Sequence, residues 1–440
     1  MQFFGREKEI AELRLIRERS HQYAKFTVIT GRRRIGKTEL IKQALNDGAD
    51  LFIYLLIRRL GEKTLCHSLQ QDIENAGLEA LGQAETFCDL IRLVVKAAKT
   101  RPITLVIDEF QEFDKINPAV FGELQGIWDD CQHTAKLNLL VCGSVNRLMN
   151  KIFFNREQPL YGRNTGHLKL KPFSATLLKT ILGHYKPDYT GDDLWCLWTL
   201  TGGVARYVQL LMDAHACDRA AMFDEILSES SPFLDEGKIL LAEEFGAEYS
   251  VFFSILTEIA SGKDTFGDLT NAVGQEIGTY LSRLENDYGI ISRIVPIFDR
   301  EKSRNTHYTL EDAFLRFWFR FLYKYRSWIE MDRKDALKTL IQRDFATFAG
   351  FSLERYFRWK FIGESSYTRI GGWWDRKGEN EIDLVCEDEL SGQVDIYEVK
   401  ADRARFDAAA LQKKIDAFLE KNPTLKGRIK RTDVLSLKNL

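Results

Sequence analysis

Short apolar runs alternate with amphipathic helical stretches over roughly the first 150 residues of the chain. Near-continuous apolar runs are typical of strands that are buried on both faces of a parallel sheet. The stretches between them are long enough to form the helical crossovers that parallel strands require. The pattern therefore predicts an α/β core whose strands cover Phe26–Gly31, Asp50–Leu56, Ile103–Phe110 and Leu137–Ser144.

The pattern changes several times after this core, and a length of 440 residues also favours several domains. A helical region comes first, followed by three helical segments and two strand-like runs in the order of a winged helix-turn-helix. An aromatic and arginine-rich segment precedes a final stretch of mixed helices and strands. We therefore expect an α/β core at 1–167, a helical lid at 168–248, a winged helix at 249–312, a basic aromatic bridge at 313–344 and a small α/β domain at 345–440.

Composition and charge narrow the class of protein. Apolar residues make up 45% and charged residues 29% of the chain, as in globular proteins. The net charge of −2 indicates no general attraction to nucleic acid or membranes, so such a partner would need a local patch. The longest apolar run, Leu51–Ile57, is far shorter than the roughly 20 residues of a spanning helix, and the start of the chain lacks a secretory signal pattern. Seven scattered cysteines without a CxxC pair favour reduced thiols. We expect a cytoplasmic protein without a membrane partner.

A phosphate-binding motif follows the first predicted strand directly and leads into a helix. Glycines allow backbone N–H groups to turn onto phosphate oxygens, and the helix N-terminus adds a positive dipole. In the motif GxxxxGK[ST], the lysine reaches the β- and γ-phosphates and the hydroxyl residue binds Mg²⁺. The sequence thus predicts a P-loop for ATP and Mg²⁺ formed by Gly31, Arg32, Arg33, Arg34, Ile35, Gly36, Lys37, Thr38 and Glu39.

Other candidate residues follow later strands of the predicted sheet. Asp108 would hold Mg²⁺ through its water shell, and Glu109 would polarise the attacking water; the alternative is that both acids only cap a strand. Ser144, at the tip of the fourth strand, has the position of a γ-phosphate sensor or of an ordinary turn serine. Arg163 would reach the phosphates in cis or in trans, or would be a surface arginine.

These motifs occur together in a known family. FFGREKEI, VITGRRRIGKTEL, LVIDEFQEF, CGS, YGR and TGGVARYV appear in this order. They resemble the ATPase domain first catalogued in archaea and also found in bacteria, which is related to the AAA+ and signal-transducing NTPases. The resemblance covers roughly residues 1–230 and implies that Gly5 and Arg6 lie near the nucleotide base and that the segment around Gly203 to Tyr207 covers the site. Val204 and Ala205 depart from the usual family pattern there.

The winged helix is a candidate DNA-binding element. Its third helix, at Gln275–Asn286, would be the recognition helix. A second interpretation is an adaptor between domains, because the helix carries acids beside Arg283. The basic residues expected on the wing, where phosphates would pass, are Arg293, Arg300, Lys302 and Arg304.

A carboxylate and lysine cluster is predicted near the C-terminus. Strand alternation places Glu398 and Lys400 on one face, Asp383 lies on a neighbouring predicted strand, and Glu354 lies on a helix that can point at the same place. Such carboxylates bind Mg²⁺, which activates water, while a lysine positions the nucleophile. The predicted metal ligands here are Asp383 and Glu398.

This region also resembles a known domain. FLRFWFRF, GGWWDRKGENEIDLV and YEVK are similar to the domain of uncharacterised function that accompanies this ATPase in many prokaryotes, a restriction-endonuclease-like PD-(D/E)xK fold. The resemblance spans about residues 310–440 and implies that Glu354, Asp383, Glu398 and Lys400 form the catalytic set. Ile382 replaces the usual proline.

These observations predict an ATPase that controls metal-dependent DNA cleavage by its last domain. The alternative is a signalling or scaffold NTPase switch whose last domain only binds nucleic acid or protein. The sequence leaves open whether the chain acts as a homo-oligomer.

Overall fold

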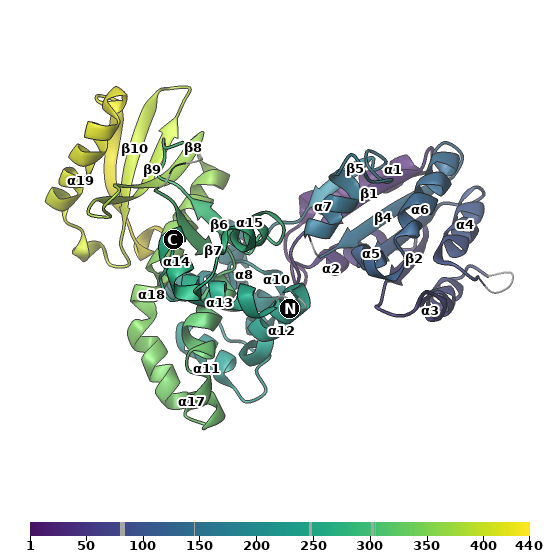
Figure 1. The fold of residues 1–440 in the computed structure, drawn as a ribbon, viewed down its shortest axis with the longest axis horizontal. Coiled ribbons are helices and arrows are strands. Elements are labelled where there is room, and N and C mark those ends of the chain that lie inside the picture. The colour runs from purple at the N-terminus through teal and green to yellow at the C-terminus, as the bar shows by residue number, and fades with distance from the viewer. Residues whose placement is uncertain (80–83, 145, 246–248, 301–302, 304) are drawn as a thin grey trace. The chain divides into compact units, whose positions relative to one another are not determined.

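The computed structural model describes residues 1–440 except 80–83, 145, 246–248, 301–302 and 304 (Figure 1). The chain divides into two compact units. The N-terminal unit comprises residues 4–171, and the C-terminal unit comprises residues 1–3 and 172–440. No helix among the described residues is both long and apolar enough to cross a membrane.

A parallel sheet lies at the centre of the N-terminal unit, which confirms the predicted fold class. Its described strands follow the order β2-β3-β4-β1-β5. The fifth strand was not predicted, because its four residues alternate between half-buried and exposed at the sheet edge and give little apolar signal. The strands are β1 (Lys25–Thr30), β2 (Leu51–Leu56), β3 (Ile103–Asp108), β4 (Leu137–Gly143) and β5 (Gly166–Lys169).

Helices cover both faces of this sheet and form two separate cores (Figure 1). Neighbouring strand residues enter opposite cores: Leu105 packs with α3, α4 and α6, whereas Val106 packs with α1 and α2. Both side chains are 0% exposed, which explains why the sequence of this strand is a continuous apolar run. The helices are α1 (Glu7–Ser20), α2 (Lys37–Leu45), α3 (Glu62–Asn75), α4 (Phe87–Ala98), α5 (Phe113–Ile116), α6 (Ala119–Cys131) and α7 (Asn146–Phe154).

The C-terminal unit begins with a helical region, as the sequence predicts. Its helices are α8 (Ala175–Tyr185), α9 (Gly191–Thr201), α10 (Ala205–Asp213), α11 (Arg219–Leu227) and α12 (Phe233–Phe245). Helix α9 packs against α18 (Lys334–Glu364). The indole N–H groups of Trp195 and Trp198 donate to the carbonyl oxygens of Ala349 and Ser352 at 3.1 and 2.9 Å. Because buried Trp N–H groups need acceptors, these two bonds fix α9 on α18.

Three helices and a two-stranded hairpin follow in the order of a winged helix. They are α13 (Tyr249–Ala260), α14 (Phe266–Val273), α15 (Gly278–Asn286), β6 (Ile291–Ile294) and β7 (His307–Leu310). The third helix starts at Gly278, three residues later than the predicted Gln275. Ile297, after β6, belongs to the core of the last domain, and its N–H donates to the carbonyl oxygen of Gly372 at 2.8 Å. The hairpin therefore packs directly on that domain.

The aromatic segment continues the chain as α16 (Ala313–Phe317), a π-helical turn (Trp318–Tyr323) and α17 (Arg326–Glu330). The aromatic side chains of this segment are buried, so the segment forms part of the hydrophobic core. They are Phe314, Phe317, Trp318 and Phe321. Helix α18 then runs without interruption across residue 344, so the boundary predicted there falls inside a helix.

The last domain contains a sheet in the order β11-β10-β9-β8. Strands β8 and β10 pair antiparallel with β9, and β11 pairs parallel with β10. Helix α19 connects β10 to β11, and its Leu411, Ile415 and Phe418 pack against the sheet. The elements are β8 (Arg369–Trp374), β9 (Glu381–Asp388), β10 (Gln393–Val399), α19 (Ala408–Lys421) and β11 (Ile429–Leu435).

The contact between α9 and α18 gives a stability prediction. We expect Trp195→Phe to reduce the free energy of unfolding by about 2–4 kcal/mol, because the buried hydrogen bond to Ala349 is lost and the smaller phenyl ring leaves a cavity. Denaturation followed by tryptophan fluorescence measures this change. Trp328→Phe in α17 is the control, since the Trp328 indole makes no hydrogen bond within the described residues. An equal loss of unfolding free energy in Trp195→Phe and Trp328→Phe would contradict a stabilising role of the Trp195 contact.

Candidate functional site

The phosphate-binding loop lies between β1 and α2, where its glycines are structurally required. Gly31 has φ +156°, and a Cβ atom there would lie 3.0 Å from the carbonyl oxygen of Leu170. Gly36 has φ 91° at the N-cap of α2. A side chain at either position would strain the backbone or collide with it. Ile35 is 1% exposed and anchors the loop in the core beneath it.

Lys37 is the buried cation of this loop. Its Nζ donates to the carbonyl oxygens of Gly31 at 2.9 Å and Arg32 at 3.2 Å. Burial lowers the pKa of the Lys37 ammonium, and the nearby carboxylates of Glu109 and Asp108 counteract this effect. The ammonium thus lies inside the loop, held by backbone oxygens that phosphate oxygens can replace.

Asp108, at the end of β3, lies beside the P-loop as predicted. The hydroxyl of Thr38 donates to its Oδ2 at 2.9 Å, and the N–H of Glu109 donates to its Oδ1 at 2.9 Å. Tyr54 of β2 also donates its hydroxyl to Asp108 Oδ2. Burial, followed by the charge of Asp108, raises the pKa of the Tyr54 phenol, which therefore stays a donor. Sequence reasoning missed Tyr54, although its polar tip in an otherwise apolar strand was a usable signal.

Glu109 adopts a left-handed conformation with φ 55° and turns its side chain toward β4. The hydroxyl of Ser144 donates to Glu109 Oε2 at 2.9 Å, and the amide of Gln111 donates to the same oxygen. Ser144 and Gln111 are 4% and 0% exposed. The structure therefore joins the predicted water-polarising acid to the predicted sensor, and adds Gln111, which the sequence did not single out.

The remaining predicted residues of this site are less closely joined to it. Arg163 forms a bidentate ion pair with Asp129 at 3.3 and 3.2 Å. Glu39 is exposed on α2. Arg6 donates to the carbonyl oxygen of Lys171 at 2.7 Å. The three loop arginines, which are half-buried, are Arg32, Arg33 and Arg34.

The predicted carboxylate and lysine cluster is assembled in the last domain. Lys400 Nζ lies 2.8 Å from Glu398 Oε1 and 3.5 Å from Asp383 Oδ2. The N–H of Val399 also donates to Asp383 Oδ2 at 2.7 Å. Burial and the charge of Glu398 raise the pKa of Asp383 to about 6. The antiparallel pairing of β9 with β10 brings these residues together, as the alternation predicts.

Two further side chains complete the cluster. Lys414 of α19 donates to Glu398 Oε1 at 2.8 Å, so that oxygen accepts from two ammonium groups. The other oxygen, Oε2, is buried and has no hydrogen-bond partner in the part of the chain that the structure describes. On α18, burial and the charge of Asp383 raise the pKa of Glu354 well above its ordinary value. Lys414 was missed, although the basic character of its helix was visible in the sequence.

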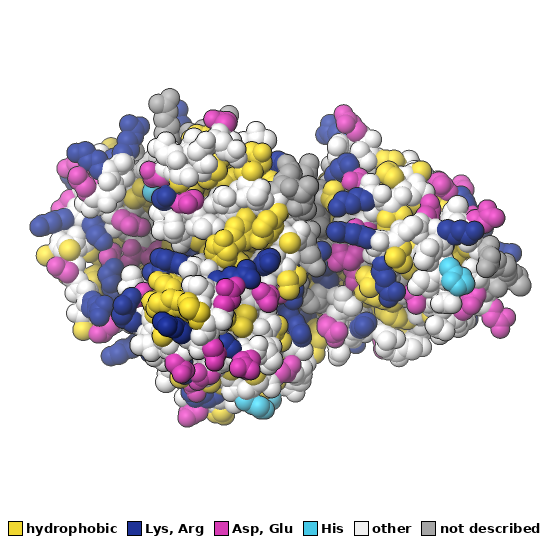
Figure 2. Space-filling model, turned by 60° about the horizontal axis from the view of Figure 1, so that its bottom comes forward, with side chains coloured by type: hydrophobic (Ala, Val, Ile, Leu, Met, Phe, Trp, Pro, Cys, Tyr) yellow, Lys and Arg dark blue, Asp and Glu magenta, His cyan; other side chains and the backbone are white. Residues whose placement is uncertain are grey.

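The predicted DNA-contacting residues have mixed outcomes. Arg293 and Arg300 are exposed, whereas Lys302 and Arg304 lie outside the described residues. The guanidinium carbon of Arg283, on α15, lies 5.0 Å from the ring centroid of Phe252. This cation therefore packs against the winged helix itself. On the face shown in Figure 2, basic side chains are interspersed with acidic and apolar ones.

Comparisons with known families agree with this geometry. Residues 3–211 match the family described as an ATPase domain predominantly from Archaea. The N-terminal part of the chain is therefore similar to a P-loop ATPase domain in both sequence and fold. Residues 318–412 match a family described as archaeal and bacterial proteins of unknown function, so the chain is similar to an ATPase domain followed by a domain of that family.

Similar whole proteins are also found. An uncharacterised protein of Methanocaldococcus jannaschii is 28% identical over 418 residues, which cover 90% of this chain and 87% of that protein. A Walker-type ATPase of Pyrococcus abyssi has a similar fold, with a TM-score of 0.56 at 19% identity, covering 72% of this chain and 96% of the other. The ORC2 protein of Aeropyrum pernix gives a TM-score of 0.49 at 15% identity, covering 78% and 96%.

The raised pKa of Asp383 predicts how stability depends on pH. An unfolded aspartate titrates near pH ~3.9. The native protein therefore binds this proton more tightly, and its free energy of unfolding should fall as pH rises from about 4 through about 6. Asp383→Asn removes this loss, so between pH 4 and 7 the variant should gain on the order of 2 kcal/mol relative to the wild type.

Denaturation curves at both pH values measure this difference. Only Trp128 of the 8 tryptophans lies in the N-terminal unit, so tryptophan fluorescence reports mainly on the unit that contains Asp383. Asp388→Asn is a matched control at the end of β9, where a hydrogen bond from Ser391 lowers the pKa of Asp388 and the effect has the opposite sign. If the free energy of unfolding changes equally with pH in the wild type and in Asp383→Asn, the raised pKa of Asp383 is ruled out.

Proposed function

We propose that this chain hydrolyses ATP and couples its ATPase domain to DNA binding and to metal-dependent DNA cleavage by its C-terminal domain. The observation that carries this proposal is the presence of two assembled polar sites in one chain. One joins Thr38 to Asp108 beside Lys37, and the other joins Asp383 and Glu398 to Lys400. The winged helix between the two domains in the chain, with exposed Arg293 and Arg300, supplies the candidate DNA contact.

In the ATPase domain, Lys37 would exchange the carbonyl oxygens of Gly31 and Arg32 for phosphate oxygens. Thr38 and Asp108 fit a hydrated Mg²⁺, because a hydroxyl and a carboxylate lie 2.9 Å apart beside the loop and Tyr54 orients the carboxylate. The ion would neutralise charge on the phosphates. Glu109 would orient the attacking water and receive its proton, and Ser144 would set the position of the Glu109 side chain.

In the C-terminal domain, the order α18, β8, β9, β10, α19, β11 supports a restriction-endonuclease-like fold. Asp383 and Glu398 fit a divalent cation, because Glu398 Oε2 is buried with no hydrogen-bond partner among the described residues, and burial and the charge of Glu398 raise the pKa of Asp383. The ion would activate water and stabilise charge on the phosphodiester. Lys400 would donate to the attacking water or to a phosphate oxygen once it leaves Glu398.

A second candidate function is a signalling or scaffold NTPase whose last domain binds without cutting. The two lysines on Glu398 favour it, since both compete with a metal ion for that carboxylate. Among the described residues, no group of three or more His, Cys, Asp or Glu side chains forms a ready metal site. Cleavage therefore requires Lys400 or Lys414 to move away from Glu398.

ATP hydrolysis is tested first. We expect Lys37→Ala to weaken ATP binding at least 10-fold and Glu109→Gln to retain ATP binding while hydrolysis falls by about 100-fold or more. Phosphate release and nucleotide titration separate these effects. Glu123→Gln, at an exposed position of α6, should behave as wild type. Unchanged phosphate release in Glu109→Gln would exclude it as the water-polarising acid.

Cleavage is tested with purified protein on single- and double-stranded DNA, with Mg²⁺ or Mn²⁺ and with or without ATP. We expect the wild type to cut, Asp383→Ala/Glu398→Ala to lose cleavage, and Lys37→Ala to alter the response to ATP. Glu389→Ala, exposed after β9, is the control. Hydrolysis of ATP without cleavage under any condition would favour the signalling or scaffold function instead. An equal cleavage rate with and without ATP would remove the coupling.

A further inference from the structure

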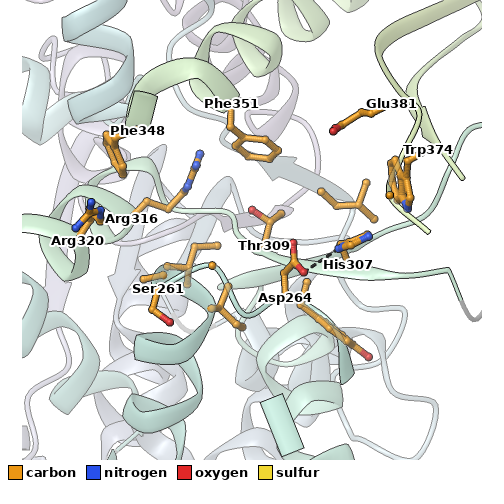
Figure 3. Close-up of a pocket in the computed structure, with 17 residues that line it drawn as sticks. Ser261, Asp264, His307, Thr309, Arg316, Arg320, Phe348, Phe351, Trp374 and Glu381 are labelled. Atoms are coloured by element: carbon orange, nitrogen blue, oxygen red, sulfur yellow. Dashed lines mark ion pairs between the residues drawn. The ribbon is translucent and has the colours of Figure 1, made fainter. Parts of the chain in front are cut away.

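A cavity of about 460 Å³ lies beside the carboxylate cluster, within the C-terminal unit (Figure 3). Its walls come from the end of α13, strand β7, the aromatic segment, α18 and the strands β8 and β9. This volume is within the range of small-ligand sites. The side chains that matter below are Arg316, Arg320, His307, Phe351, Trp374 and Glu381.

The walls of the cavity are joined by direct bonds. The side-chain amide of Asn305, in the hairpin, donates to the carbonyl oxygen of Trp374 at 3.2 Å. Arg355 of α18 forms an ion pair with Glu311 after β7 at 2.6 Å. The N–H of Tyr308 donates to the carbonyl oxygen of Asp264 at 2.7 Å. The cavity is therefore preformed and needs no ligand to hold its walls together.

Arg316 places a buried cation on one side of the cavity. Its guanidinium carbon lies 4.3 Å from the ring centroid of Phe351, and the guanidinium forms no hydrogen bond or ion pair within the described residues. Burial and the charge of Arg355 lower the pKa of Arg316 to about 10, so it remains charged at neutral pH. Arg320 lies on the same side, 3.7 Å from the carboxylate of Asp344. Glu354 and Glu311 act on this cation only through space, so a bound anion that forms direct hydrogen bonds would reduce the cost of its burial.

The opposite side of the cavity is aromatic and offers acceptors. Figure 3 shows Trp374, His307 and Glu381 on the side away from the two arginines. The rings of His307 and Trp374 are in contact, with centroids 5.2 Å apart. His307 Nδ1 lies 2.9 Å from Asp264 Oδ1, which fixes the orientation of the imidazole. Aromatic faces stack on heterocyclic bases, and carboxylates accept hydrogen bonds from the amino groups of bases. One side of the cavity is thus cationic, and the opposite side is aromatic with a carboxylate acceptor.

We propose that this cavity binds a nucleoside phosphate, with the phosphate on Arg316 and the base against Trp374. The site is separate from the P-loop and does not require cleavage by the C-terminal domain. The bound nucleoside phosphate is either a free mononucleotide or an unpaired nucleotide of a DNA strand, because both present a base and a phosphate. Arg316 also interacts electrostatically with Glu354, so a bound phosphate would lie next to the carboxylate cluster.

Calorimetric titration of the full chain carrying Lys37→Ala tests this proposal, because that background weakens phosphate binding by the P-loop. The probes are dAMP, inorganic phosphate, deoxyadenosine, a single-stranded oligonucleotide and a blunt duplex, all without divalent metal so that cleavage plays no part. We expect dAMP or the single strand to bind at least tenfold more tightly than phosphate, deoxyadenosine or the duplex. Binding of dAMP identifies a free nucleotide as the source, and binding of the single strand alone identifies an unpaired nucleotide.

Adding Arg316→Gln should weaken this binding at least tenfold, since a charge-assisted bond is lost. Arg326→Gln is the matched control, because Arg326 is exposed on α17 and pairs with Glu330. Where Arg316→Gln lowers the melting temperature, Arg316→Lys retains the charge and removes the planar fork, and the same loss is expected. Binding that is unaffected by both Arg316 variants, or no binding of dAMP or single strand, would overturn the proposal. Neither outcome depends on whether the protein cuts DNA.

Discussion

The parallel pairing of β3, β4 and β1 decides where the candidate residues of the ATPase domain lie. Register pairs Thr30 with Gly143 and Ile107 with Val141, so the carboxyl ends of three strands meet at one edge of the sheet. The P-loop, Asp108 and Ser144 each follow one of these ends. The hydrogen bonds from Thr38 to Asp108 and from Ser144 to Glu109 are therefore consequences of strand order. They connect residues that are 70 and 35 positions apart in the chain.

The two candidate metal sites satisfy their carboxylates in different ways. Asp108 accepts from the hydroxyls of Thr38 and Tyr54, which are neutral and can keep their places when a cation binds nearby. Glu398 accepts from the ammonium groups of Lys400 and Lys414, which already neutralise it. A cation must compete with these two charges at Glu398, whereas it meets no such competition from the two hydroxyls at Asp108. Metal affinity should therefore differ between the two domains even though both use carboxylate oxygens.

The sequence was informative wherever one chemical requirement fixed several residues at a set spacing. The P-loop, the buried strands and the Glu398–Lys400 alternation each encode local geometry, so their positions could be predicted. The sequence marks Tyr54 and Lys414 only as polar residues in unusual surroundings, and it does not mark Gln111. Their partners could not be predicted, because tertiary packing brings each partner near. Strand β5 was missed because an edge strand of four residues lacks a continuous apolar run. The extent of α18 was missed although Leu337, Ile341 and Phe345 recur at helical spacing and are buried, because the turns before residue 345 were assigned to a separate segment.

The two tryptophan bonds between α9 and α18 limit how this long helix can move. Trp195 and Trp198 are three residues apart and bond to carbonyl oxygens that are also three residues apart, at Ala349 and Ser352. A slide of α18 along its axis by one turn, about 5.4 Å, would break both bonds at once. Tilting about the indole contacts would break neither. Phe351 lies between the two bonded carbonyl groups, and Glu354 lies two residues after the second. The pocket wall and the buried carboxyl group are thus carried by the part of α18 that α9 holds most directly.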